Sequence, residues 1–254
     1  LDITDREATI NYIRRHQPDT VINCAAFTNV DGCETARDAA FKVNAIGPRN
    51  LALACEKIGA RLIHVSTDYV FPGTANGGVA LDECAVPAPI SAYGQTKLLG
   101  EQYVERFCRR HFIVRTAWLY GYVGKNFVKT MVNAARRTGS LTVVDDQLGN
   151  PTNAADLAHH ILKLAVTEEY GVYHCTGEGV CSWYEFTKEI VRLAGLQATV
   201  APCTSAEYKA AHPAAADRPA WSALDNRMLR CTVGDEMRPW KQALAAFFEN
   251  WNGE

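Results

Sequence analysis

The sequence predicts an α/β protein built on a doubly wound parallel sheet. Short apolar runs rich in β-branched residues, such as residues 20–26 and 61–67, alternate with longer stretches of helical periodicity. Runs that are apolar throughout are typical of strands buried on both faces, as the strands of parallel sheets are. With 254 residues, the chain is long enough for one large α/β domain and a smaller lobe.

The composition argues against several classes of protein. The net charge of −2 gives no basic excess for binding nucleic acid. No apolar run approaches the ~18 residues of a membrane-spanning helix, and no signal peptide is recognisable. The nine cysteines are odd in number and form no C-x-x-C pair, so we expect free thiols in a reducing, cytoplasmic environment. The histidine spacing predicts no metal site.

The first elements are expected to be a helix, a strand and a second helical tract. Asp5 is a suitable N-cap for a helix that ends before Pro18. The strand at residues 20–26 ends in small and then polar residues, which suits close approach to a ligand. In the tract at residues 34–58, Gly47-Pro48 predicts a break or kink.

The following elements continue the alternation. The strand at residues 61–67 completes a βαβ unit and ends in hydroxyl side chains. A helix from about Ser91 then leads to a strand at residues 111–116, which the right-handed crossover rule places in the same sheet. Further helices are expected at residues 126–138, 154–166, 183–194 and 239–251, and further strands at residues 141–144 and 171–175.

A Tyr-x-x-x-Lys pair is the principal chemical signal in the chain. Tyr93 and Lys97 are four residues apart, so a helix places both on one face. A neighbouring ammonium favours a phenolate, and we expect it to lower the pKa of Tyr93 toward the range of acid–base catalysis. Such a pair also arises by chance, with Glu101 as an ordinary helical partner of Lys97.

Thr67 and Trp118 are predicted to lie on the same sheet edge as this pair. Thr67 ends one central strand and Trp118 follows the next, at the carboxyl ends where open α/β sheets bind ligands. A hydroxyl, a phenol and an ammonium together suit hydride transfer to a carbonyl. Tyr93 would protonate the developing alkoxide, and Thr67 would hydrogen-bond that oxygen.

Several stretches carry a resemblance that spans nearly the whole chain. They are residues 23–31, 43–51, 66–73, 93–97, 115–120, 146–152, 171–174 and 217–219. In this order they resemble the extended short-chain dehydrogenase/reductase superfamily and, within it, the dTDP-4-dehydrorhamnose reductase family. The resemblance implies hydride transfer from NADPH or NADH to the C4 keto group of dTDP-4-dehydro-β-L-rhamnose, giving dTDP-L-rhamnose. A homodimer is left open.

The resemblance also implies roles for individual residues. The catalytic residues would be Tyr93, Lys97 and Thr67. The cofactor would meet Asp2, Ile3, Ala26, Phe27, Thr28, Val65, Tyr93 and Lys97, with Phe27 replacing a polar aromatic residue of many relatives. The sugar nucleotide would meet Thr67, Asp68, Trp118 and Arg218, of which Arg218 is equally well read as a surface arginine. Residues 1–174 would form a Rossmann-like NAD(P)-binding domain with interleaved pieces of a second lobe, and residues 175–254 would mainly bind the sugar nucleotide.

Proteins with other functions, within and outside the superfamily, share parts of this pattern. Sugar-nucleotide dehydratases place an acid after Thr-Asp, where this chain has Tyr69. Epimerases share the Tyr/Lys pair, and the stretches beyond Arg115 argue against them without removing them. A non-catalytic relative, the regulatory β subunit of methionine adenosyltransferase, would make this a partner-binding protein, which the intact Thr67, Tyr93 and Lys97 disfavour only modestly.

One departure from the family concerns the start of the chain. Members begin with a strand, a glycine-rich turn and a helix that cradle the pyrophosphate, and this first βαβ portion does not precede Leu1. We therefore expect an N-terminally shortened polypeptide. The 254 residues alone should bind NADPH weakly or not at all in isothermal titration calorimetry; tight binding would contradict this expectation.

Overall fold

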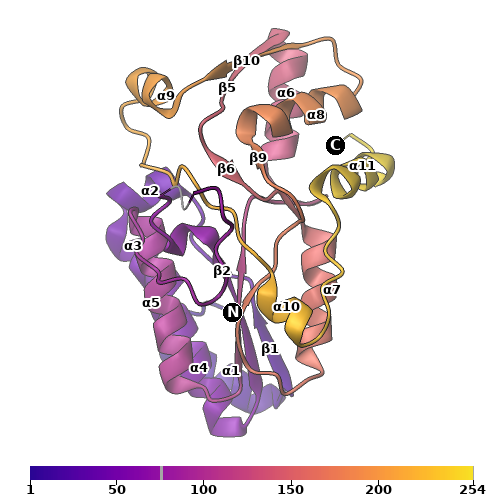
Figure 1. Cartoon of the computed structure of the whole chain (residues 1–254). Coiled ribbons are helices and arrows are strands. Elements are labelled where there is room, and N and C mark those ends of the chain that lie inside the picture. Colours follow the sequence, from indigo (N-terminus) through magenta and orange to yellow (C-terminus); the bar gives the residue numbers. More distant parts are fainter. Residues whose placement is uncertain (75–76, 254) are drawn as a thin grey trace.

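The structure is a computed structural model that describes residues 1–74 and 77–253. A four-stranded parallel sheet forms the lower part of the molecule, and a smaller group of helices and strands lies above its carboxyl ends (Figure 1). The strand order is β1-β2-β3-β8. The strands are β1 (Thr20–Asn23), β2 (Arg61–Thr67), β3 (His111–Thr116) and β8 (Gly171–His174). The predicted α/β class with a parallel sheet is confirmed.

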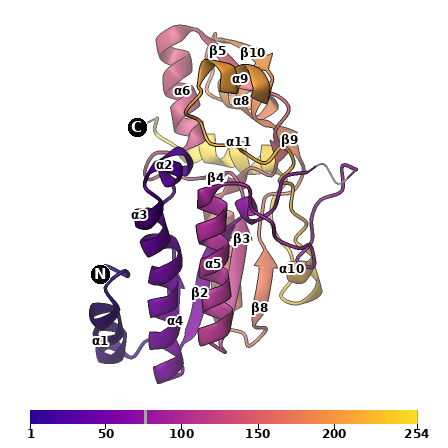
Figure 2. The ribbon, with the colours of Figure 1, turned by 90° about the vertical axis from the view of Figure 1, so that its left-hand side faces the viewer.

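Helices cover both faces of this sheet (Figure 2). The helices α1 (Arg6–His16), α4 (Gly47–Ile58) and α5 (Ala92–Phe107) pack on one face, and α7 (Ala154–Ala165) and α10 (Arg227–Cys231) pack on the other. Adjacent residues of β2 show why: Leu62 points into the cluster with Leu51 and Val104, and Ile63 points into the opposite cluster with Leu157. Side chains alternate across a strand, so a continuously apolar strand needs cover on both sides.

The tract expected at residues 34–58 is divided into shorter helices. It comprises α2 (Val30–Thr35), α3 (Arg37–Phe41), a π-helical turn η1 (Lys42–Ile46) and α4. At Gly47-Pro48, where a break or kink was expected, the backbone changes from π-helix to α-helix without leaving the helical region, and the break lies at Ala36. The turn directs the buried Asn44 toward the sheet edge. Its Oδ1 accepts the N–H of Phe27 at 2.8 Å, and its Nδ2 donates to Thr96 Oγ1 at 3.2 Å. The π-helical turn therefore ties the loop after β1 to α5.

The upper part packs two helices on a separate small sheet. Its elements are β4 (Leu119–Tyr120), α6 (Phe127–Thr138), β5 (Ser140–Val144), β6 (Leu148–Gly149), β7 (Thr152–Asn153), β9 (Cys181–Ser182), α8 (Trp183–Leu193), β10 (Thr199–Cys203), α9 (Ser205–Ala211) and α11 (Trp240–Asn250). The strand predicted at residues 141–144 is present, but it pairs with β10 and not with the main sheet. An aromatic core that includes Tyr120, Phe186 and Phe247 joins α6, α8 and α11.

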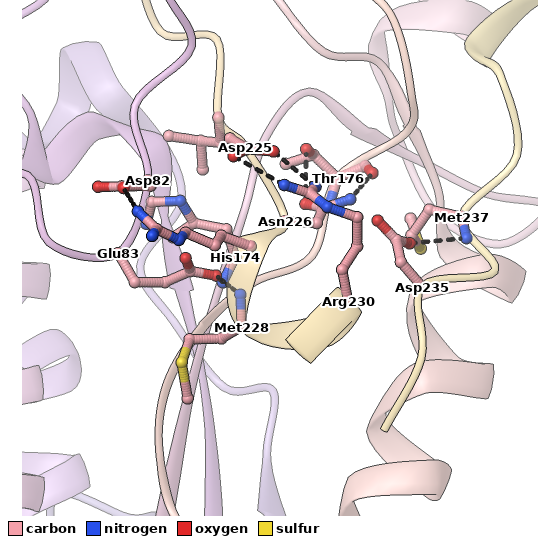
Figure 3. Close-up of polar contacts among 12 residues, drawn as sticks. Asp82, Glu83, His174, Thr176, Asp225, Asn226, Met228, Arg230, Asp235 and Met237 are labelled. Carbon is pink, nitrogen blue, oxygen red and sulfur yellow. Dashed lines mark hydrogen bonds and ion pairs between the residues drawn. The ribbon is translucent and has the colours of Figure 1, made fainter. Parts of the chain in front are cut away.

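Polar contacts fasten the returning C-terminal chain to β8 (Figure 3). The side chain of Asn226 accepts the backbone N–H of Thr176 at 3.0 Å and donates to its carbonyl at 2.8 Å. Glu83 Oε1 accepts the N–H groups of His174 and Met228 at 2.8 and 3.1 Å. These bonds satisfy buried backbone groups that no strand partner reaches, and they hold α10 beside the sheet.

The nine cysteines all lie in the described part of the chain and are free thiols, as predicted. Across residues 1–74 and 77–253, no helix has both the length and the apolar character needed to cross a membrane.

Replacing Asn226 by alanine should destabilise the protein. The buried N–H, hydroxyl and carbonyl of Thr176 would each lose a partner, and we expect the free energy of unfolding to fall by about 2–4 kcal/mol in urea denaturation. Asn133→Ala, on the exposed surface of α6, is the matched control and should change it by less than about 0.5 kcal/mol. Equal stability of the two variants would show that the Asn226 contacts do not stabilise the fold.

Candidate active site

A pocket of about 420 Å³ lies where the carboxyl ends of the central strands meet the first turn of α5. Eight of the residues predicted for the site line it, from four separate segments of the chain. They are Ala26, Thr28, Val65, Thr67, Asp68, Tyr93, Lys97 and Trp118. Neighbouring parallel strands end at one edge of the sheet, which explains why residues so far apart in sequence meet there.

Thr67 lies at the centre of the polar contacts in this pocket. Its side chain lines the pocket together with the phenol of Tyr93, and its Oγ1 donates to Asp68 Oδ1 at 2.9 Å. Ser91 caps α5 by accepting the N–H of Gly94, so Tyr93 occupies the first turn of the helix. A Cβ atom at Gly94 would collide with the carbonyl oxygen of Tyr69. Glycine at this position therefore lets α5 bring Tyr93 close to Thr67.

Lys97 is buried below the pocket, with 2% of its surface exposed. Its Nζ donates to the carbonyl of Val65 at 2.6 Å and lies 3.4 Å from His64 Nε2. Burial lowers the pKa of Lys97 to about 8, and the carboxylate of Glu101 opposes this shift. Lys97 is thus a cation that loses its proton more easily than a solvated lysine does.

The expectation that Lys97 lowers the pKa of Tyr93 is wrong for this structure. Burial raises the pKa of Tyr93, and the carboxylate of Asp68 adds to the rise while Thr67 opposes it. The two side chains share a helix face as predicted, but the amine of Lys97 turns to the Val65 carbonyl in β2. Tyr93 therefore keeps its proton across the physiological pH range, which is the form that a proton donor needs.

A buried ion pair supports the site from behind. Arg115 Nη2 of β3 lies 2.7 Å from Glu101 Oε2 of α5, and Ser66 Oγ of β2 donates to Glu101 Oε1. The guanidinium also lies over the ring of Phe71, 5.2 Å from its centre. Since both charges are paired and hydrogen-bonded, their burial is tolerated. The three elements that carry Thr67, Lys97 and Trp118 are thereby fixed to one another.

Trp118 joins the pocket to the upper part of the molecule. Its ring is stacked on Trp183 of α8, with 3.5 Å between centroids and 7° between planes. Its backbone has φ of 47°, which is costly for a bulky residue and is typical of functional sites. A Cβ atom at Gly149 would come within 2.7 Å of the Trp118 ring. The sequence did not identify Trp183, because nothing local links it to a residue 65 positions earlier.

A second pocket, of about 310 Å³, shares Trp183 with the first. It is lined by residues of α6, α8, α9 and β5, together with Arg218. Arg218 Nη2 lies 3.1 Å from Asp31 Oδ1 of α2, so this arginine also connects the two parts of the molecule.

The lining of the first pocket does not include Asp2, Ile3 or Phe27. Asp2 accepts the N–H and the hydroxyl of Thr4 at 2.9 and 2.8 Å, and Ile3 packs against Gly47. Phe27 packs behind Tyr93 in a small apolar cluster. Their roles at a cofactor therefore stay predictions.

The first pocket suits the nicotinamide-ribose end of a dinucleotide. The Nζ of Lys97 uses one N–H on Val65 and keeps further donors for ribose hydroxyls. The small side chain of Ala26 leaves room at the end of β1, and Tyr93 and Thr67 lie on the side where a carbonyl would react. The nicotinamide-ribose end of the cofactor would be held by Tyr93, Lys97, Ala26, Thr28 and Val65. When bound, this cofactor supplies a hydride.

Comparisons with known proteins show the family of the chain. The family model described as the RmlD substrate binding domain matches residues 1–252. A dTDP-4-dehydrorhamnose reductase of Mycobacterium tuberculosis is 43% identical over 249 residues, which cover 96% of this chain and 80% of that protein. A dTDP-4-keto-6-deoxy-D-glucose reductase of Streptomyces niveus is 40% identical, covering 100% and 87%. The crystal structure of dTDP-4-dehydrorhamnose reductase from Bacillus anthracis in complex with NADP superimposes with a TM-score of 0.93 at 43% identity, covering 98% and 86%. The chain therefore belongs to the RmlD substrate-binding domain family.

Proposed function

We propose that this protein reduces the C4 keto group of dTDP-4-dehydro-β-L-rhamnose to give dTDP-L-rhamnose, with NADPH or NADH as hydride donor. The observation that carries the proposal is the meeting of the Tyr93 phenol, the Thr67 hydroxyl and the buried Lys97 in one pocket at the sheet edge. The names of its relatives support the substrate class, and the NADP in the Bacillus anthracis structure supports the cofactor.

The residues of the chain account for the fate of the proton. As a hydride reaches the carbonyl carbon, negative charge develops on the carbonyl oxygen. Tyr93 donates its proton to this oxygen, because an alkoxide is a much stronger base than a phenolate. Thr67, whose hydroxyl donates to Asp68 in the free site, would turn this hydroxyl to the same oxygen and stabilise the developing charge. The product is a neutral alcohol, and the Tyr93 phenolate is reprotonated before the next turnover.

The nucleotide end of the substrate would lie between the two parts of the molecule. We place the sugar against Thr67, Asp68 and Trp118, and the nucleotide in the second pocket beside Trp183. Arg218 would contact the diphosphate, exchanging its surface partner Asp31 for a ligand anion. On this proposal residues 1–174 mainly bind the cofactor, and residues 175–254, with the interleaved segment from α6 to β6, mainly bind the sugar nucleotide.

The experiment that tests the proposal follows NADPH oxidation by the purified protein with dTDP-4-keto-6-deoxysugars. Turnover of the rhamnose precursor supports the proposal. Preference for the gluco-configured ketone would favour the activity for which the Streptomyces niveus relative is named. No turnover, together with tight binding of a methionine adenosyltransferase, would replace the proposal by a regulatory role.

Tyr93→Phe should lower kcat by about 100-fold or more, the scale expected for loss of a general acid. The ring is kept, so NADPH binding measured by calorimetry should change little. Tyr12→Phe, on the exposed surface of α1, is the matched control and should leave kcat unaltered. Equal kcat values for the two variants would remove Tyr93 from the mechanism.

Asp68→Asn should stabilise the folded protein at neutral pH. Burial raises the pKa of Asp68 to about 6, so the ionised carboxylate costs stability above that pH, and protonation removes the cost as the pH falls. A rise of two pKa units corresponds to about 3 kcal/mol. Urea denaturation should show a gain of up to about that size at pH 7.5 and a smaller gain at pH 5. Asp38→Asn, exposed on α3, is the control. Destabilisation at pH 7.5 would show that the hydrogen bond from Thr67 more than offsets the burial.

A further inference from the structure

Three polar side chains form a buried row beneath the active-site pocket. Asn23 ends β1, His64 lies in β2 and Lys97 lies in α5, with exposed fractions of 4%, 0% and 2%. Asn23 Nδ2 lies 2.9 Å from His64 Nδ1, and His64 Nε2 lies 3.4 Å from Lys97 Nζ. Because the row is shielded from solvent, its donors and acceptors must satisfy one another.

The backbone N–H of Ala25 fixes the orientation of the Asn23 amide. This N–H can only donate, and it lies 3.1 Å from Asn23 Oδ1. Turning the amide over would place its NH₂ group against the N–H of Ala25, so that two donors would face each other. The Nδ2 of Asn23 therefore faces His64 and donates to Nδ1.

The orientation of Asn23 in turn fixes the tautomer of His64. Burial, with Lys97 as a neighbour, holds the pKa of His64 well below its ordinary value, so the ring is neutral. A neutral imidazole has one N–H; since Nδ1 accepts from Asn23, the hydrogen is on Nε2. This Nε2–H is directed at Lys97. An ammonium has no lone pair to accept it, whereas a neutral amine has one.

We infer that Asn23 and His64 are positioning residues that present a hydrogen-bond donor to Lys97 and thereby favour its neutral amine in the free site. The inference concerns Lys97 itself; only its catalytic consequence rests on the proposed reductase function. Lys97 can donate to the Val65 carbonyl either as an ammonium or as a neutral amine. This hydrogen bond therefore favours neither protonation state.

Other titratable groups face Lys97 from the elements packed against it. Glu101, one turn further along α5, favours the ammonium, but its carboxylate is already bound by Arg115 of β3 and Ser66 of β2. Cys24, which directly follows β1, also favours the Lys97 cation, but less than Glu101 does. Tyr93 keeps its proton and adds no charge. Burial therefore outweighs the acids and lowers the pKa of Lys97 to about 8, in the direction that the Nε2–H of His64 requires.

The consequence for catalysis is a lysine that changes protonation state near physiological pH. In the proposed reduction, a Lys97 ammonium helps to hold the cofactor ribose and restores the proton lost by Tyr93. Loss of the Lys97 proton should therefore set the alkaline limb of kcat, and the row of Asn23 and His64 should set the pH at which that limb falls.

The first test reads the tautomer directly in the ¹⁵N-labelled 254-residue chain. Long-range ¹H–¹⁵N correlations distinguish the two ring nitrogens, and His64→Gln identifies the signal among the seven histidines. We expect the hydrogen on Nε2 of a neutral ring. A hydrogen on Nδ1 would overturn the inference. Because neither cofactor nor substrate is needed, this result stands apart from success or failure of the reductase assay.

The second test uses Asn23→Asp to reverse the direction of the hydrogen bonds in the row. A carboxylate can only accept, so it would take the N–H of Ala25 and move the His64 hydrogen to Nδ1, leaving Nε2 to accept from a Lys97 ammonium. The pKa of Lys97, followed through its Nζ and Cε signals in lysine-labelled protein, should rise by one unit or more. In the purified protein, the alkaline limb of kcat should move by the same amount.

A double-mutant cycle separates this effect from the added negative charge. If the row acts through the ring, Asn23→Asp should shift the pKa of Lys97 in the wild-type background and have little effect beside His64→Leu. An equal shift in both backgrounds would mean that the charge acts directly, and the inference would fail. Should Asn23→Asp not fold, the tautomer of His64 in the wild-type chain still decides the question.

Discussion

The close approach of α5 to the carboxyl end of β2 is the constraint on which the site depends. Gly94 permits it, since a Cβ atom there would collide with the carbonyl oxygen of Tyr69, just after β2; Gly100 likewise lets α5 approach the carbonyl oxygen of Asn44 in η1. The helix therefore lies close enough for Tyr93 to meet Thr67 and for Lys97 to reach the backbone of β2. The ion pair between Glu101 and Arg115 then fixes the helix at this distance.

Burial disfavours the charged form of Tyr93, Asp68 and Lys97 alike. The pKa of Tyr93 rises, that of Asp68 rises to about 6 and that of Lys97 falls to about 8, each because desolvation disfavours the charged form. Without a ligand, these three side chains therefore favour their neutral forms. Negative charge that develops on a reacting carbonyl oxygen would face the hydroxyl groups of Tyr93 and Thr67 with little competing solvent. Hydroxyl donors stabilise such a charge most strongly where solvent is excluded.

Most helices, the strands of the main sheet and the meeting of Thr67, Tyr93 and Lys97 could be predicted from the sequence, because apolar periodicity and strand order are local signals. The pKa of Tyr93 could not, since the path of the Lys97 side chain depends on the Val65 carbonyl. Trp183 escaped for a similar reason: its stacking on Trp118 is a contact between distant segments. The π-helical turn was missed because Asn44 sits in an otherwise ordinary helical pattern.

The stacked indoles of Trp118 and Trp183 give the molecule an internal optical reporter. Two parallel chromophores with centroids 3.5 Å apart couple their electronic transitions, and the coupling decays steeply as the rings separate or rotate. One ring is attached to the end of the main sheet and the other to α8. Ultraviolet circular dichroism of this pair would therefore register any displacement of the upper part relative to the sheet without an added label.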